Sequence, residues 1–216
     1  MAVLFHVIGL IGILFFDRDF FIRSTPVNLL LMFALVIWTQ ETKSRDFFLF
    51  FVACFLIGIG VEIMGVRTHL LFGDYKYGDV LGPKLAEVPL IIGLNWFLII
   101  YCCGISIHTL LKKLISRIVV EPGKKPQTLK ALSVVVDGAT VAVFFDWVME
   151  PVAVKLGYWQ WLGNGEIPIF NYLSWFAVSV ILLALFHFMS FSKNNKFAIN
   201  LLLIQLMFFL LLRTFL

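Results

Sequence analysis

The stretch FFLFFVACFLIGIGVEIMGV, residues 47–66, decides the fold of this chain. Glu62 is its only charged residue. The hydrocarbon core of a bilayer takes about 20 apolar residues of helix, and a backbone inside lipid must satisfy its own hydrogen bonds. The stretch therefore predicts a membrane-spanning helix that carries one carboxylate.

Similar segments recur along the chain and explain its composition. The 216 residues are 61% hydrophobic and 14% charged, whereas a globular domain is about 45–50% apolar and about 25% charged. The segments predicted to span the membrane are 1–16, 25–40, 47–66, 86–111, 131–151, 168–191 and 197–216. We therefore predict an all-α integral membrane protein, with a single polytopic domain over residues 1–216 and about seven transmembrane helices.

The placement of charge predicts an orientation. Ten Lys and Arg residues lie in the connectors after the second, fourth and sixth segments, and seven lie on the opposite side. Because positive charge favours the cytoplasmic side, we expect those three connectors and the N-terminus in the cytoplasm, in a bacterial inner membrane. The net charge of +4 is small, and no basic stripe interleaved with aromatic residues points to a nucleic acid partner.

An internal repeat links the two long outer connectors. Each copy has an acid, a glycine eleven residues later, and then two aromatic residues separated by one position. The first copy is Glu62, Gly73, Tyr75 and Tyr77, and the second is Asp146, Gly157, Trp159 and Trp161. We predict a parallel repeat of two helical hairpins, at about 47–111 and 131–191, with a shared site between them. Chance matching among common membrane residues is the alternative.

Carboxylates inside spans are costly and are therefore candidates for function. The repeat pairs Glu62 with Asp146, and Glu150 lies four residues after Asp146, on the same helix face. Burial and mutual repulsion would keep one of these acids protonated, and such a group is a good general acid. The alternative is simple ion pairing, of Glu62 with Arg67 and of Glu150 with Lys155.

Further polar and aromatic residues accompany these acids. The candidates for substrate binding are Arg67, His69, Tyr75, Tyr77, Asn95, Trp96, Trp159, Trp161, Asn171 and Trp175. The aromatic residues would form either an interfacial belt or a wall whose π faces stabilise a cation, and the two Asn side chains would position water. The four histidines form no cluster with metal-ligand spacing, so we predict no metal site.

Several stretches resemble a known family when taken together. They are residues 60–68, 72–77, 82–84 and 88–96, followed by 146–153, 159–161 and 167–172. Their combined pattern resembles the membrane carotenoid-biosynthesis family that includes the CruF-type carotenoid 1,2-hydratases and the haloarchaeal bisanhydrobacterioruberin hydratase. The resemblance covers roughly residues 50–180, and no single motif carries it.

The resemblance implies an activity and its partners. Family members add water across the terminal double bond of an acyclic carotenoid ψ-end, such as that of γ-carotene or lycopene. Proton transfer gives a tertiary carbocation, which water captures, and no cofactor or metal is required. The implied partners are a lipid-soluble carotenoid, membrane lipid and other carotenoid-biosynthesis enzymes.

The sequence leaves two other functions open. A lycopene cyclase begins with the same protonation but captures the cation with an internal double bond. A non-enzymatic carotenoid-binding or transport protein could use the same hairpins. For the hydratase, we expect Glu62 and Asp146 to divide the acid and water-activating roles, with Glu150 in support.

Overall fold

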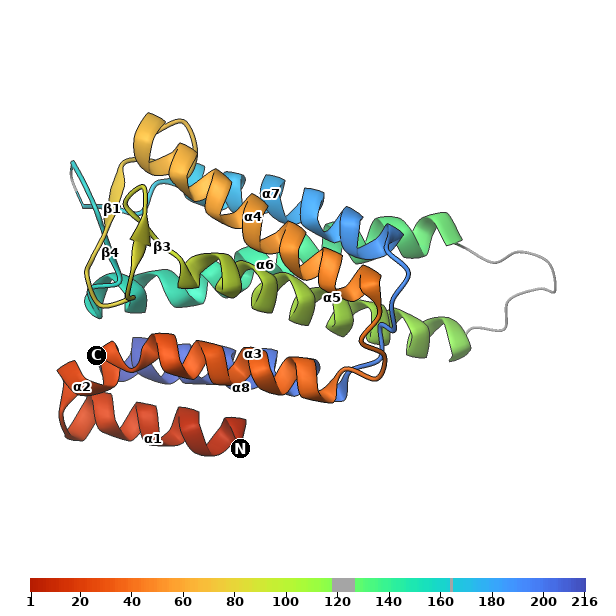
Figure 1. Cartoon of the computed structure of the whole chain (residues 1–216), viewed down its shortest axis with the longest axis horizontal. Coiled ribbons are helices and arrows are strands. Elements are labelled where there is room, and N and C mark those ends of the chain that lie inside the picture. The colour runs from red at the N-terminus through yellow and green to blue at the C-terminus, as the bar shows by residue number, and fades with distance from the viewer. Residues whose placement is uncertain (118–126, 164) are drawn as a thin grey trace.

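The computed structural model describes residues 1–117, 127–163 and 165–216. The helices are α1 (Ala2–Phe15), α2 (Arg18–Arg23), α3 (Thr25–Thr39), α4 (Arg45–Thr68), α5 (Ile91–Arg117), α6 (Gln127–Lys155), α7 (Ile169–Phe188) and α8 (Lys196–Phe215). The strands are β1 (Tyr75–Tyr77), β2 (Lys84–Leu85), β3 (Val88–Pro89) and β4 (Trp159–Trp161). The helices run roughly alongside one another, and the strands gather at one end of the bundle (Figure 1).

Helix α5 forms the centre of the bundle. It packs against α3, α4, α6, α7 and α8. In its most apolar stretch, 78% of the residues are buried, against 44% or less in the other long helices. A helix that is apolar on every side belongs inside a bundle. The residues near the N-terminal end of α5 therefore lie among the neighbouring helices.

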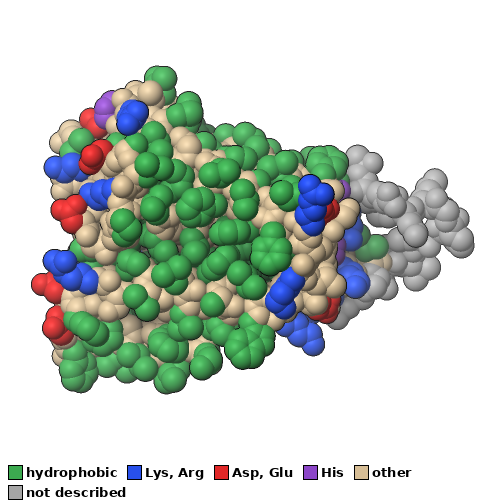
Figure 2. Space-filling view, viewed as in Figure 1, with side chains coloured by type: hydrophobic (Ala, Val, Ile, Leu, Met, Phe, Trp, Pro, Cys, Tyr) green, Lys and Arg blue, Asp and Glu red, His purple; other side chains and the backbone are tan. Residues whose placement is uncertain are grey.

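Five helices, α4 to α8, are long and apolar enough to cross a membrane. Helices α1 and α3 have 14 and 15 residues, which at about 1.5 Å per residue is about 21–23 Å, short of a hydrocarbon core of about 30 Å. Apolar side chains cover the flank of the molecule and charged ones gather at its two ends (Figure 2). An all-α membrane protein is thus confirmed, whereas the count of seven spans, the orientation and the host membrane stay predictions.

Strands β1 and β4 join the two long connectors at one end of the bundle. They are antiparallel, with Tyr75 opposite Trp161 and Tyr77 opposite Trp159. Because side chains alternate along a strand, these four aromatic side chains turn inward, while the residues between them are exposed. Such pairing suits a two-fold relation between hairpins, although the repeat itself and the single-domain assignment stay predictions.

A close backbone approach at Gly78 holds this ribbon together. The Gly78 N–H donates to the Tyr158 carbonyl at 2.9 Å. A Cβ at position 78 would lie 2.1 Å from the carbonyl oxygen of Gly157, so a side chain there would force the connectors apart. The ribbon therefore fixes the aromatic face over the ends of α4 and α6.

Candidate active site

Three carboxylates meet beneath the β1–β4 ribbon. Glu62 of α4 is 5% exposed, and Asp146 and Glu150 of α6 are 0% and 1% exposed. All three line a cavity of about 30 Å³. Since a water molecule needs about 10–15 Å³ of such space, the cavity can hold water among the acids. Its other lining residues are Phe72, Tyr75, Tyr77, Ile92, Asn95, Trp96, Met149, Trp159, Trp161, Asn171 and Trp175.

Glu62 accepts three hydrogen bonds. The Tyr75 and Tyr77 hydroxyls donate to its Oε2 at 2.5 and 2.7 Å, and the Trp96 indole Nε1 donates to its Oε1 at 3.0 Å. Burial, reinforced by the nearby Glu62 carboxylate, raises the pKa of both tyrosines well above the usual value. Both phenols therefore keep their protons and remain donors.

Two glycines make room for these donors on the same face of α4. Gly58, Glu62 and Gly65 are spaced by four and three residues, so they share that face. A Cβ at Gly58 would lie 2.7 Å from the Trp96 ring, and one at Gly65 would lie 2.9 Å from the Tyr75 hydroxyl oxygen. The glycines let an indole and a phenol pack directly on the helix beside the carboxylate.

The two acids of α6 have different partners. The indoles of Trp159 and Trp161 donate to Oε1 of Glu150 at 2.7 and 2.6 Å. Asn171 donates through Nδ2 to Oδ2 of Asp146 at 2.8 Å. Within the described part of the chain, Oδ1 of Asp146 is buried and has no hydrogen-bond partner. Asp146 thus has an oxygen left for water or substrate.

Aromatic rings enclose the acids on several sides. Trp96 and Trp175 stack with centroids 4.0 Å apart at an interplanar angle of 20°. Across the ribbon, the ring centroids of Tyr75 and Trp161 are 5.4 Å apart, and those of Tyr77 and Trp159 are 5.9 Å apart. Such π faces attract a cation, so the walls of the cavity can stabilise positive charge near the carboxylates.

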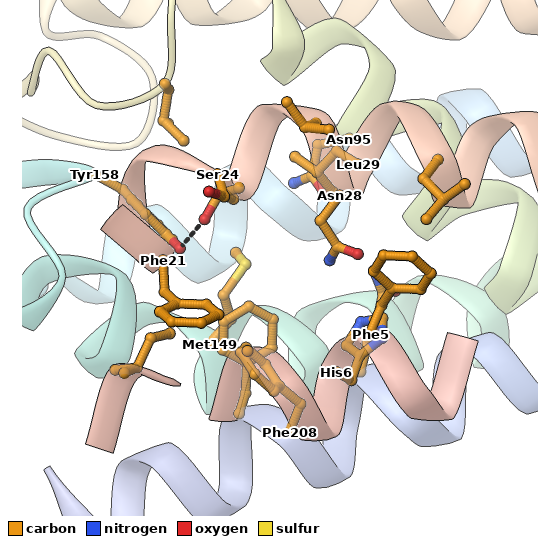
Figure 3. Close-up of a pocket in the computed structure, with 18 of the residues that line it drawn as sticks. Phe5, His6, Phe21, Ser24, Asn28, Leu29, Asn95, Met149, Tyr158 and Phe208 are labelled. Carbon is orange, nitrogen blue, oxygen red and sulfur yellow. Dashed lines mark hydrogen bonds between the residues drawn. The ribbon is translucent and has the colours of Figure 1, made fainter. Parts of the chain in front are cut away.

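A second cavity of about 320 Å³ adjoins the first. Ile92, Asn95, Met149 and Trp159 line both cavities and so form the boundary between them. Apart from a few polar groups, apolar and aromatic side chains surround the larger cavity (Figure 3). A hydrogen bond of 2.7 Å between the Thr25 and Tyr158 hydroxyls crosses one end of it.

The structure brings most of the predicted site residues together. Those that line the small cavity are Glu62, Tyr75, Tyr77, Asn95, Trp96, Asp146, Glu150, Trp159, Trp161, Asn171 and Trp175. Arg67 and His69 lie outside it, exposed at the end of α4, where His69 Nδ1 is 3.0 Å from Asp74 Oδ1. Phenol, indole and amide donors surround the acids, in place of the ion pairs with Arg67 and Lys155 that the sequence also allowed.

Some lining residues were not anticipated. Phe72, Ile92 and Met149 complete the small cavity. Of these, Met149 has a sequence signal, because it lies between Asp146 and Glu150 and three residues from the first. No three His, Cys, Asp or Glu side chains in residues 1–117, 127–163 and 165–216 are placed to hold a metal ion together.

Comparison with known proteins agrees with the resemblance inferred from the motifs. Residues 25–216 match the family described as "Carotenoid biosynthesis protein". The bisanhydrobacterioruberin hydratase of Haloarcula japonica is 30% identical over 143 residues, which are 63% of this chain and 43% of that relative. The chain thus spans less than half of that relative's length, and no solved structure matches it. The family match covers most of the sequence and includes all three acids, so the chain belongs to the carotenoid biosynthesis protein family.

Proposed function

We propose that this protein adds water to the terminal double bond of an acyclic carotenoid ψ-end. The observation that carries the proposal is the set of three buried carboxylates around a water-sized cavity with aromatic walls. A proton adds to the less substituted carbon, and the tertiary carbocation that results lies between π faces and carboxylates. Water then forms the C–O bond and returns a proton, so that the net change is the addition of one water molecule.

The hydrogen bonds suggest how the acids divide the work. Asp146 accepts from Asn171 and, within the described residues, has a second oxygen without a hydrogen-bond partner, so we assign the transferred proton to it. Both indoles bind Oε1 of Glu150, and we assign to its Oε2 the proton that water releases. That proton then passes to Asp146 and restores its protonated form. Glu62, held by three donors, opposes the charge of the cation. In this proposal Glu150 activates water, a role that we expected from the sequence for Glu62 or Asp146.

Hydration is favoured over cyclisation by the polar character of the small cavity. A cyclase must exclude water until an internal double bond captures the cation. Here the carboxylates lie around a space that accommodates water, and one oxygen of Asp146 has no hydrogen-bond donor among the residues that the structure describes. The related protein from Haloarcula japonica is named as a hydratase.

The test is expression in a bacterium that makes lycopene, followed by chromatography and mass spectrometry of the pigments. We expect a product heavier by one water, with an unchanged polyene chromophore. A product of unchanged mass with a β-ring would replace hydratase by cyclase, and unchanged lycopene would refute both enzymes. Asp146→Asn should lower the rate by about 10²–10⁴-fold, the usual contribution of a general acid.

A further inference from the structure

We propose that the larger cavity binds the terminal isoprenoid units of the carotenoid, while the rest of the polyene stays in the bilayer. This deepens the proposed function and rests on it. The cavity lies among α1, α2, α3, α5, α6 and α8, and most of its lining side chains are apolar. Such a lining suits a hydrocarbon chain.

The side chains shared with the acid-lined cavity indicate which part of the ligand enters. The larger cavity meets the smaller one at Ile92, Asn95, Met149 and Trp159. A linear hydrocarbon that fills the larger cavity therefore reaches side chains that also line the cavity of the carboxylates. Figure 3 shows Asn95 and Met149 among the side chains that surround the larger cavity.

The volume limits how much of the ligand is enclosed. About 320 Å³ is near the lower end of ligand pockets, which span about 300–1,000 Å³. A pocket of this size encloses one end of a carotenoid and leaves most of the molecule outside. The protein would thus recognise one ψ-end and make little contact with the other.

An apolar opening gives the outer part of the molecule a path into lipid. Phe5 and Ile8 of α1, Phe20 of α2 and Val27 of α3 line the cavity, yet they are 41%, 46%, 62% and 67% exposed. These side chains therefore belong both to the cavity and to the apolar outer surface. A hydrocarbon can enter between α1 and α3 without crossing water.

Gly9 offers a way to fill the cavity. It lines the cavity, and a Cβ there would meet only Phe208, at an ordinary contact distance of 3.7 Å. Gly60 in α4 is the matched control, because it lines neither cavity and a Cβ there would meet nothing within 4 Å. Val27→Trp is a second filling variant, on a different helix.

The experiment measures lycopene that copurifies with the protein from a lycopene-producing host. Each variant is made in an Asp146→Asn background, so that the substrate is not consumed, and bound pigment is read from visible absorbance per protein. We expect Gly9→Ala and Gly60→Phe to keep bound lycopene within about twofold. Gly9→Leu, Gly9→Phe and Val27→Trp should each lower it by about tenfold, equivalent to a tenfold loss of affinity.

The outcomes separate this inference from the proposed function. Retention of lycopene by monodisperse Gly9→Phe and Val27→Trp proteins would overturn the binding site, as would the absence of lycopene from the Asp146→Asn parent. Failure of the wild-type protein to hydrate lycopene would overturn the reaction alone, because the comparison of bound pigment would still decide the cavity. Elution on size exclusion, measured for every variant, identifies any that fail to fold.

Discussion

Replacing Glu62 by Gln should destabilise the protein far more than replacing Asp146 by Asn. The Glu62 carboxylate presents two acceptor oxygens to three donors, with both phenols on Oε2 and the Trp96 indole on Oε1. A Gln side chain keeps one oxygen and turns an NH₂ group toward the other set of donors. If the oxygen stays with the phenols, the amide and the indole become two buried donors facing each other.

The cost follows from these contacts. A hydrogen bond to a charged group contributes about 1.5–3 kcal/mol, and a buried donor without an acceptor costs about 1–3 kcal/mol. The substitution should therefore cost about 3 kcal/mol or more, which is about 6–12 °C in Tm for a protein of this size. Asp146 accepts one hydrogen bond, from Asn171, which an Asn oxygen can still accept, so Asp146→Asn should cost about 1 kcal/mol or less.

The assay is thermal melting of the purified protein in detergent, followed by the fraction that remains monodisperse after heating. A Tm of Glu62→Gln within about 2 °C of the wild-type Tm would refute the three-donor account. The same conclusion would follow if Glu62→Gln were no less stable than Asp146→Asn. A double-mutant cycle with Tyr77→Phe tests the same contact. Since Tyr77 and Glu62 share a hydrogen bond, the two losses should fall short of additivity by about 0.5–3 kcal/mol.

Three further predictions concern packing, pH and substrate range. Gly58→Ala should lower stability by about 1–3 kcal/mol, because its Cβ would displace Trp96, whereas Gly60→Ala, with open space around its Cβ, should not; melting of both variants tests this. Burial raises the pKa of Tyr158 to about 12. The contribution of this residue to stability is therefore complete below its usual pKa of about 10 and is lost as the pH rises toward 12. The Tm of Tyr158→Phe should fall less steeply with pH than the wild-type Tm above pH ~10. A carotenoid with one β-ring and one ψ-end should be hydrated as lycopene is, and its rejection in a pigment assay would show that the protein also reads the far end.

The acid cluster could be predicted because charge in a lipid-facing sequence is rare and expensive. Glu62, Asp146 and Glu150 stood out within apolar segments, and the structure places all three on one cavity. Their hydrogen-bond partners could not be predicted, since the repeat aligned Trp159 and Trp161 with Asp146. In the structure both indoles donate to Glu150, because the direction of β4 is set by its pairing with β1 and by the turn after α6.

The N-terminal region shows what hydropathy alone leaves out. Residues 1–16 and 25–40 were predicted as spans, but α1 and α3 are shorter than a bilayer core. The charged connector between them forms the short helix α2, which the Asp17 side chain caps by accepting from the Phe20 N–H at 3.0 Å. Hydropathy measures how apolar a segment is, and it does not register a local cap that turns a connector into a helix.

The larger cavity could not be predicted from the sequence, and two glycines of α1 show why. Gly12 takes the ring of Phe21 so closely that a Cβ would lie 2.3 Å from it, whereas three residues earlier a Cβ on Gly9 would meet only Phe208, at 3.7 Å. The first glycine permits tight packing and the second leaves space. In the sequence, the two glycines cannot be told apart, because both are small residues in an apolar helix. A carboxylate inside a membrane span can be recognised in the sequence, because its burial in lipid is costly. A hydrocarbon site is instead a space that side chains leave unfilled, and whether such a space exists depends on how helices distant in sequence are placed.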